Sequence, residues 1–376
     1  MDTVTHALVG AAVSDCYFRR RLGPLATPLA LIVSALPDFD MAARLVSRES
    51  VWMYHRGFTH SFLPMLAAAP ILGYLGYRLS RRESSWTLWS LLALICLFGH
   101  TLLDLATSWG TMPLLPFSNA RLSWDIVPIV DIFLTSTTAA SFVINRILRW
   151  ERVDNFLNPL AYPVVHRHPA RQRAGDWLSK VAMTLVVLYL AVGWHQNRQT
   201  VRIAREELAR QGVEAVEVRA LPIMFTYVAY GIAARDAGGT IYNAAYSSYA
   251  RGPMRFVRFE SLPRDELAGI LATPQGGLFE WYTQNMYVAD REAAEWGERI
   301  WLHDRRFFLL GNPEQGRFDM EFRLDFSGAV TGVYSEQLGR RGIVVKEELL
   351  RLWELTRDGR DMDATNLQPG SILEVD

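Results

Sequence analysis

Histidines and aspartates recur at short spacings in the first third of the chain, inside or beside long apolar segments. The candidate metal ligands among them are His6, Asp38, Asp40, His55, His60, His100 and Asp104. Neutral imidazole and carboxylate are the ligands that zinc takes when thiolates are absent. Cys16 and Cys96 are the only cysteines and both lie in apolar stretches, so a metal here would be held by histidine and carboxylate.

The spacing within two of these pairs suits a shared ion. His100 and Asp104 are four residues apart, so on a helix they project from one face. Asp38 and Asp40 flank a single residue just after Pro37, so both carboxylates can turn toward one centre or bridge two ions. The candidates outnumber the four ligands of a tetrahedral ion, which predicts one to three zinc ions, with other divalent metals left open. Such ions lower the pKa of bound water and clamp phosphoryl or acyl oxygens.

Further polar residues beside the ligands are candidates for catalysis or support. Asp38 or Asp40 would orient or deprotonate the water, and Arg56 would hold a phosphate in bidentate fashion. An equal alternative is that Arg56 and Arg121 orient the carboxylate ligands. The remaining candidates for support or substrate binding are Thr59, Thr107, Asp125 and Asp131, and Asp131 has the alternative of pairing with Arg56 or Arg121. Any one of these polar groups can also be an ordinary interhelical hydrogen bond.

Apolar segments long enough to cross a bilayer, which takes roughly 17–25 residues, are the elements that must position these groups. They cover residues 62–79, 86–106, 126–148 and 177–194, with a slightly shorter fifth at 22–37. Residues 3–18 are helical in character but too short to span. The sequence therefore predicts a mostly α, polytopic helical bundle of about four to five spans plus a short N-terminal helix. Residues 3–37 are expected to form a hairpin that turns at Arg19–Arg21.

Arginines in the short loops predict the orientation of the bundle. The turn at 19–21, the loop at 78–82 and the loop at 146–173 fall on one side and are arginine-rich, so that side is predicted to be cytoplasmic. Loops 38–61 and 107–125 and everything after Trp194 are then extracytoplasmic. Every candidate ligand falls at that outer face. The start Met1-Asp2-Thr3 lacks the positive charge of a signal peptide, so we expect the N-terminus to be retained.

The chain changes character after the last span, which predicts a membrane-embedded domain of residues 1–196 and a soluble, extracytoplasmic α+β domain of residues 197–376. Residues 201–211 are charged and helical, as in a connector. Residues 215–234 and 240–259 are rich in β-forming residues and flank Asp236-Ala237-Gly238-Gly239, which predicts a β-hairpin. Further strands are predicted at 305–310 and 320–326, and a helix at 346–356.

The overall charge is balanced, with 39 basic and 39 acidic residues. No basic field therefore argues for nucleic acid as a partner. The expected partners are membrane lipids and a small or lipid phosphoester substrate, while the oligomeric state is left open.

Together the motifs resemble a known family. They are Met1-Asp2-x-x-Thr5-His6-Ala7-Leu8-x-Gly10, Pro37-Asp38-x-Asp40, His55-Arg56-Gly57-x-Thr59-His60-Ser61, His100-x-x-x-Asp104-x-x-Thr107-Ser108-x-Gly110-Thr111, Pro116-Phe117-Ser118 and Trp124-Asp125. This set, which covers about residues 1–135 well and the later spans loosely, resembles the bacterial inner-membrane, metal-dependent hydrolases of the YdjM-like (LexA-regulated) group. The resemblance implies a multi-pass protein of the bacterial cytoplasmic membrane, and it supports metal chemistry better than any particular substrate.

A more distant likeness is to zinc-dependent phospholipase C and P1-type nucleases, helical proteins whose three zincs are held by histidine and aspartate in a similar order. The residues that match in kind are His6, Asp38, His55, His60, His100 and Asp104. Those enzymes also use an N-terminal tryptophan amine as a ligand, whereas this chain begins Met1-Asp2.

These observations predict a membrane-bound metal-dependent hydrolase, in which zinc-activated water attacks a phosphoester, with a lipid-linked substrate as one candidate, at the outer membrane face. The alternative is a metal-ion transporter or sensor that uses the same His/Asp cluster without hydrolysis. Transport would favour a polar path through the bilayer, and the spans are expected to be apolar below the ligands, which favours the enzyme. A third interpretation gives the activity to the C-terminal domain, and the dense ligand cluster argues against it.

Overall fold

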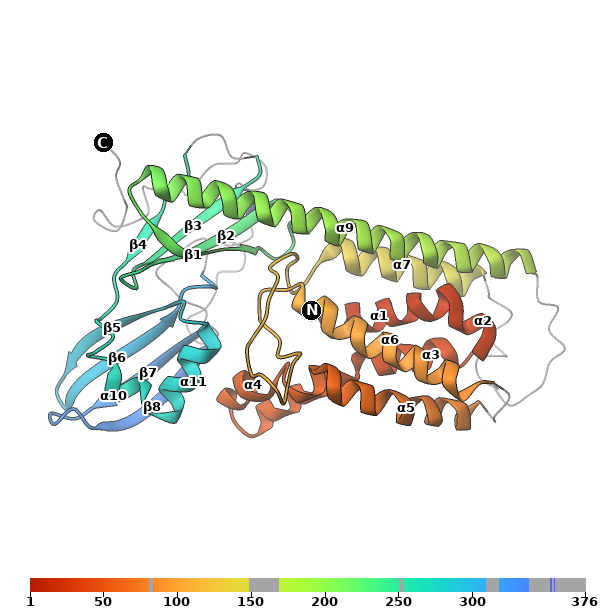
Figure 1. The fold of residues 1–376 in the computed structure, drawn as a ribbon, viewed down its shortest axis with the longest axis horizontal. Coiled ribbons are helices and arrows are strands. Elements are labelled where there is room, and N and C mark those ends of the chain that lie inside the picture. Colours follow the sequence, from red (N-terminus) through yellow and green to blue (C-terminus); the bar gives the residue numbers. More distant parts are fainter. Residues whose placement is uncertain are drawn as a thin grey trace. The chain divides into compact units, whose positions relative to one another are not determined.

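The structure, a computed structural model, describes residues 1–80, 84–148, 169–249, 253–308 and 318–337, together with Leu352, Trp353 and Leu355. The chain forms two compact units. The first, residues Met1–Ala42 and Tyr54–Val192, is helical (Figure 1). The second, residues Ala43–Met53 and Gly193–Asp376, carries two antiparallel β-sheets with short helices. The predicted class, a helical bundle with membrane-spanning helices followed by an α+β domain, is confirmed.

The predicted N-terminal hairpin is present, although its turn lies later than expected. Helix α1 (Thr3–Val13) continues through a π-helical turn η1 (Ser14–Phe18) and α2 (Arg19–Leu22), and packs against α3 (Ala26–Ala35). Gly23 ends α2 with a φ of 88°, which glycine adopts without strain, and its N–H donates to the carbonyl of Arg19. The arginines therefore form the last helical turn before the reversal.

Among the residues that the structure describes, four helices are long and apolar enough to cross a membrane: Ala26–Leu45 (α3 with the 3₁₀ helix η2, Leu36–Leu45), α5 (Phe62–Leu79), α6 (Trp86–Leu105) and Arg173–Arg210 within α9 (Pro169–Arg210). The predicted span at 126–148 is wrong at its start. The N–H groups of Ile126 and Val127 donate to the carbonyl of Ala106, so α7 begins only at Ile132 and ends at Leu148, a shorter apolar helix. The last span and the predicted connector form one continuous helix, α9.

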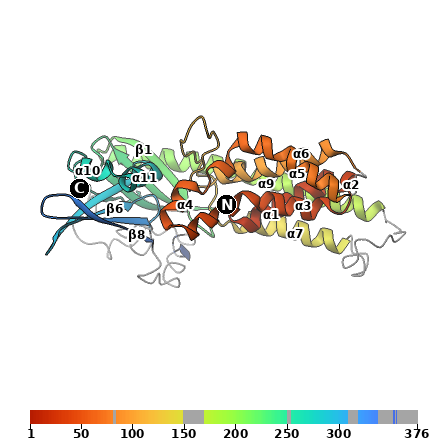
Figure 2. The same cartoon turned by 90° about the horizontal axis from the view of Figure 1, so that it is seen from below.

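Helices α1, α3, α5, α6 and α7 run side by side in the first unit (Figures 1 and 2). Small residues permit close approach between them. A Cβ atom on Gly10 of α1 would lie 2.1 Å from Ser34 Oγ of α3, and one on Gly73 of α5 would lie 2.3 Å from Ser90 Oγ of α6. Glycine at such contacts is typical of helices that associate within a bilayer. The arginine-rich loops at 81–83 and 149–168 lie outside the described residues, so the orientation of the bundle stays a prediction.

The interior of the bundle is not apolar away from the ligand layer, and that prediction is wrong. Asp15 in η1 is 2% exposed, accepts a hydrogen bond from Thr27 Oγ1 at 2.7 Å and pairs with Arg146 Nη2 at 2.5 Å. Asn145 of α7 donates to Ser179 Oγ of α9 at 2.8 Å. These polar groups hydrogen-bond to one another, which is how buried polar side chains join helices in a membrane.

The described part of the second unit contains two four-stranded antiparallel sheets with strands in sequence order (Figure 1). The first contains β1 (Ala215–Pro222), β2 (Ala229–Asp236), β3 (Ile241–Ser247) and β4 (Val257–Phe259), and the second β5 (Tyr287–Ala294), β6 (Gly297–Asp304), β7 (Phe318–Leu324) and β8 (Val330–Gln337). Helices α10 (Ala268–Leu271) and α11 (Pro274–Thr283) lie between the sheets in sequence.

The predicted turn at Asp236–Gly239 is confirmed as the link between β2 and β3, where the Thr240 N–H donates to Asp236 Oδ1. Each predicted arm of that hairpin is in fact two strands, since a second turn separates β1 from β2 and residues 248–256 separate β3 from β4. The strand predicted at 320–326 corresponds to β7. The strand predicted at 305–310 is wrong for its described part, because β6 ends at Asp304. The helix predicted at 346–356 lies largely outside the described residues.

Candidate metal centre

Three elements at one end of the helical unit bring four predicted ligands together. Asp38 lies on η2, His60 ends the 3₁₀ helix η3 (Phe58–His60), and His100 and Asp104 lie one turn apart on α6. One nitrogen or oxygen atom from each of the four lies within 4.8 Å of the others, and all four residues are buried. Within the described part of the chain this is the group of histidine and acidic side chains that could hold a metal ion.

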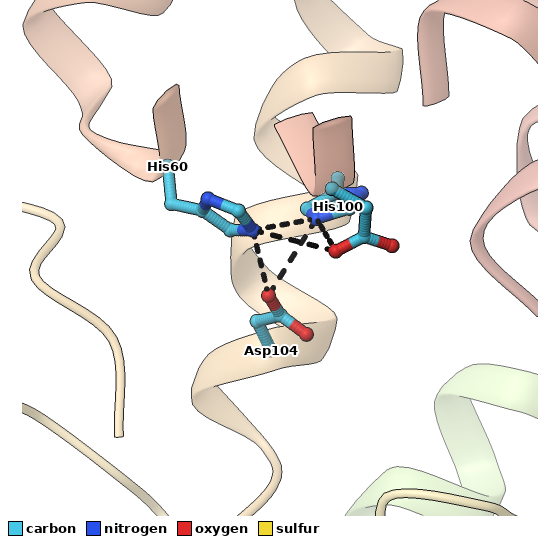
Figure 3. A group of neighbouring side chains, drawn as sticks. His60, His100 and Asp104 are labelled. Atoms are coloured by element: carbon cyan, nitrogen blue, oxygen red, sulfur yellow. Dashed lines mark hydrogen bonds and ion pairs between the residues drawn. The ribbon is translucent and has the colours of Figure 1, made fainter. Parts of the chain in front are cut away.

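The four facing atoms are Asp38 Oδ1, His60 Nε2, His100 Nε2 and Asp104 Oδ2. Figure 3 shows the side chains of His60, His100 and Asp104 pointing toward one another. His60 Nε2 lies 2.9 Å from His100 Nε2 and 3.1 Å from Asp104 Oδ2. His100 Nε2 lies 3.5 Å from Asp104 Oδ2. Asp38 Oδ1 is more distant, at 3.7 Å from His60 Nε2 and 3.6 Å from His100 Nε2. Zinc bonds of about 2.0–2.1 Å imply ligand atoms roughly 3.3 Å apart in a tetrahedron, so these separations fit one small cation.

The hydrogen bonds on the far side of each imidazole show why the centre would attract a cation when both rings are neutral. His100 Nδ1 lies 2.6 Å from the carbonyl oxygen of Ser34, an acceptor, so Nδ1 carries a proton. His60 Nδ1 lies 3.2 Å from Asp40 Oδ2, which likewise requires a proton on Nδ1. In the neutral rings both Nε2 atoms are then lone-pair acceptors that face each other and two carboxylate oxygens. Four acceptors at this distance repel one another unless a cation lies between them.

A proton on His60 is the alternative to a metal ion. Burial lowers the pKa of His60, yet hydrogen bonds to the three surrounding aspartates outweigh burial and raise that pKa to about 10. Metal ligands must be deprotonated, so an ion that binds here competes with this proton.

Asp40 does not join the four facing atoms but supports them from behind. Its Oδ1 lies 2.6 Å from His55 Nδ1, and its Oδ2 accepts from Thr59 Oγ1 at 2.6 Å and from the N–H of Arg56 at 3.1 Å. A carboxylate bonded to the remote nitrogen of a ligating histidine fixes the ring and raises its basicity. Asp40, Thr59 and His55 thus form a brace behind His60.

Arg56 is buried and directed at Asp104. Its Nη2 lies 3.0 Å from Asp104 Oδ1, and its Nη1 donates to Thr107 Oγ1 at 2.7 Å. Thr107 in turn donates to the carbonyl of Asp104 at 2.8 Å. These contacts support the orienting role of Arg56 and Thr107 over phosphate binding by Arg56.

His6 approaches the same centre from α1. Its Nε2 lies 3.1 Å from Asp104 Oδ1, and its ring stacks on that of His100 with centroids 3.6 Å apart. The α-amino group of Met1 is also ion-paired with Asp104. Asp104 therefore turns one carboxylate oxygen to the four-atom group and the other to three surrounding cationic or imidazole groups.

The remaining predicted residues, Arg121, Asp125 and Asp131, are buried but are not part of the four-atom group. Arg121 Nη2 donates to the carbonyl of Gly110 at 2.9 Å, and Asp125 is buried with a φ of 54°. Asp131 accepts from the N–H of Leu134 and from the Tyr189 hydroxyl, at 2.8 and 2.6 Å.

Two residues that contact the centre, Thr3 and Ser34, were not predicted from the sequence. Thr3 Oγ1 donates to Asp38 Oδ2 at 2.6 Å, and the Ser34 carbonyl binds His100. Thr3 could have been predicted, because it lies in the first turn of the same helix as His6. A backbone carbonyl leaves no signal in the sequence.

The fold and site define a helical membrane protein with a buried His/Asp centre that could hold a metal ion. The family model described as YdjM inner membrane protein matches residues 1–200, more than half of the chain, so this protein belongs to the YdjM inner membrane protein family. It is also similar to the uncharacterized protein YfhP of Bacillus subtilis (strain 168), with 29% identity over 157 residues. That match covers 38% of this chain and 46% of the relative, less than half its length.

No solved structure matches the chain. The likeness to zinc-dependent phospholipase C and P1-type nucleases stays a prediction.

Proposed function

We propose that this protein is a membrane-bound metal-dependent hydrolase whose ion is held by His60, His100 and Asp104 and approached by Asp38. The observation that carries the proposal is the convergence of two imidazole nitrogens and two carboxylate oxygens in a buried site, where a bound ion would replace the proton on His60. Histidine and carboxylate without thiolate suit zinc. When bound, zinc supplies Lewis acidity and lowers the pKa of a coordinated water.

The position of Asp38 suits it to proton transfer. The side chains of His60, His100 and Asp104 are fully buried, whereas that of Asp38 is 8% exposed and its Oδ1 is the most distant of the four facing atoms. Three close ligands with one accessible position are typical of catalytic zinc sites. Asp38 would accept the proton of the attacking water at Oδ1, while Thr3 fixes its Oδ2. Asp40 is less suited, because both its oxygens are already engaged by donors.

A phosphoester is the substrate class we propose, with a lipid-linked phosphoester at the outer membrane face as the preferred form. Phe39, between Asp38 and Asp40, is 72% exposed, and Phe58, at the start of η3, is 67% exposed. Exposed aromatic side chains that flank a site at the end of membrane helices suit an amphiphilic substrate. We propose further that the protein is a multi-pass chain of the bacterial cytoplasmic membrane with its C-terminal unit outside the cytoplasm, as the arginine-rich loops predict.

The test begins with metal content. Detergent-purified wild type is expected to contain about one zinc per chain, and His60→Ala and Asp104→Ala are expected to lose it. His195→Ala, at an exposed histidine on α9, is the matched control and keeps its zinc. A wild-type protein that binds no divalent metal contradicts the proposal.

Hydrolysis is then measured as phosphate release from lipid phosphoesters in mixed micelles and from a water-soluble phosphomonoester. Asp38→Asn is expected to retain zinc and lose turnover at least 100-fold, within the range for loss of a general base. Full turnover in Asp38→Asn contradicts the proposed role of Asp38.

Transport is the second candidate, favoured by the buried polar groups around Asp15, Arg146 and Asn145 deeper in the bundle. It is distinguished by zinc uptake into proteoliposomes. Uptake that Asp15→Asn abolishes, in a protein that releases no phosphate, would replace the hydrolase proposal.

A further inference from the structure

A short helix, α4 (Arg48–Tyr54), is attached to the C-terminal sheets through a tryptophan. Trp52 is 5% exposed and stacks on Tyr282 of α11, with ring centroids 5.0 Å apart and planes 13° apart. It also meets the edges of Phe279 and Phe318, at centroid distances of 5.9 and 6.4 Å. Four aromatic rings therefore form one buried cluster, in which Trp52 supplies a large apolar area.

A polar contact fastens the same helix at a second point. Glu49 Oε1 accepts a hydrogen bond from Ser335 Oγ of β8. Trp52 lies three residues after Glu49, so α4 is held at two positions about one helical turn apart. Phe318 and Ser335 lie on neighbouring strands β7 and β8, while Tyr282 and Phe279 lie on α11. Residues 43–53 consequently belong to the second unit, although they interrupt the first unit in sequence.

Residues 43–53, which include most of α4, connect two parts of the metal centre along the chain. Asp38 and Asp40 lie just before it, and His55 and His60 lie just after it. Asp38 and His60 face one another in the metal centre, and Asp40 braces His60. The link between these two halves of the centre is therefore the segment that the C-terminal sheets hold.

We propose that the C-terminal unit clamps α4 through Trp52 and thereby sets the affinity of the metal centre, which makes Trp52 and Tyr282 positioning residues for a site they do not touch. The inference rests on the metal binding proposed above. A link with no anchor samples many conformations, so the ion itself must order Asp38 and His60, and that ordering weakens observed affinity. A clamped link presents these ligands already arranged.

The test is titration of the full-length, detergent-purified protein with Co²⁺, whose visible absorption reports both affinity and ligand geometry. Trp52→Ala and Tyr282→Ala are each expected to raise the Co²⁺ Kd about tenfold or more and to change the absorption bands. Because both variants remove one contact, the double variant is expected to bind no more weakly than the weaker single variant. Trp52→Phe keeps an aromatic ring and is expected to restore most of the affinity.

Two further variants separate a loss of the clamp from a general loss of folding and from a loss of its polar contact. Trp296→Ala removes a tryptophan of the second unit that is 37% exposed, and it is expected to leave the Co²⁺ Kd unchanged. Ser335→Ala loosens only the polar attachment and is expected to raise the Kd by a smaller factor than Trp52→Ala.

The outcomes separate the two proposals. A wild-type protein that binds no Co²⁺ overturns the metal centre. A wild-type protein that binds Co²⁺, with Trp52→Ala and Tyr282→Ala binding it equally well and with unchanged spectra, overturns the clamp alone.

Discussion

His60 and His100 face each other with their Nε2 atoms 2.9 Å apart, although one comes from η3 and the other from α6. Each ring is held from behind by an oxygen, the carbonyl of Ser34 for His100 and Asp40 Oδ2 for His60. This relationship divides the predicted ligands into two groups. Those that face the shared point would hold the ion. Of the others, Asp40 and His55 lie behind His60, and His6 contacts Asp104.

The brace behind His60 is tested by Asp40→Asn. The amide cannot accept hydrogen bonds at both positions, so it loses either His55 or the group of donors at Oδ2. We expect zinc affinity to fall about 10–100-fold, as for other partners of ligating histidines, while Ala at His60 abolishes binding. Competition with a chelating dye measures the Kd. Asp265→Asn, at an exposed carboxylate, is the control. If the zinc affinity of Asp40→Asn equals that of wild type, Asp40 does not support His60 as a ligand.

Arg56 and Asp104 form a buried ion pair, so we expect Arg56→Met to lower the free energy of unfolding. Their side chains are at most 3% exposed, and the substitution leaves the Asp104 carboxylate without its guanidinium. Breaking such a pair costs about 3–5 kcal/mol. Thermal unfolding in detergent with a chelator present is expected to show this loss, and added zinc to recover part of it. Arg202→Met breaks an exposed pair with Glu206 and should cost less than about 1 kcal/mol. Equal melting of wild type and Arg56→Met would contradict the pairing.

The close contact of α1 with α3 predicts opposite effects at two glycines. A Cβ on Gly10 would lie 2.1 Å from Ser34 Oγ and 2.7 Å from the carbonyl oxygen of Ala30, so Gly10→Ala forces the helices apart. We expect a loss of about 1–3 kcal/mol, the usual range for overpacking. A Cβ on Gly99 of α6 meets no atom within 4 Å, so Gly99→Ala is expected to stabilise by up to about 1 kcal/mol through helix propensity. If the melting temperatures of Gly10→Ala and Gly99→Ala in detergent shift in the same direction, the close contact at Gly10 is contradicted.

His303 on β6 predicts a pH dependence in the second unit. Burial lowers its pKa, but hydrogen bonds to Asp290 and Asp319 outweigh burial and raise it above the ordinary value. A raised folded pKa means that the imidazolium stabilises fully below about pH 6.5, the unfolded value, and that this stability is lost as pH rises through the folded pKa. The stability difference between wild type and His303→Gln should therefore be larger at pH 6 than at pH 9. His195→Gln is the control, and a difference independent of pH would count against the ion pairs.

The helical spacing of His100 and Asp104 made their convergence predictable, because a continuous α-helix puts residues four apart on one face. The expectation that Asp38 and Asp40 turn to one centre did not allow for η2. A 3₁₀ helix has three residues per turn, so residues two apart point about 120° away from each other. Asp38 therefore faces His100 while Asp40 faces His55.

The β1–β2 turn was hidden for a different reason. It contains Phe225 with a φ of 67° and has no glycine or asparagine to mark it, so residues 215–234 resembled one strand. The turn at Asp236–Gly239 carried the usual glycines and was predicted. The place of α4 in the second unit was beyond prediction, since its partners are distant in sequence and bind it through aromatic packing that no local pattern records.

The attachment of α4 also imposes an order on biosynthesis. Glu49 and Ser335 are 286 positions apart in the chain. At about 5–20 residues per second, a ribosome takes roughly 15–60 s to pass from one to the other. All four facing ligands leave the ribosome early in that interval, while the cluster around Trp52 has no partners yet. A nascent chain thus passes through a stage in which every facing ligand is present and the link between them is still loose. Under the proposed clamp, the centre would reach its full affinity for metal only after β7 and β8 have been made.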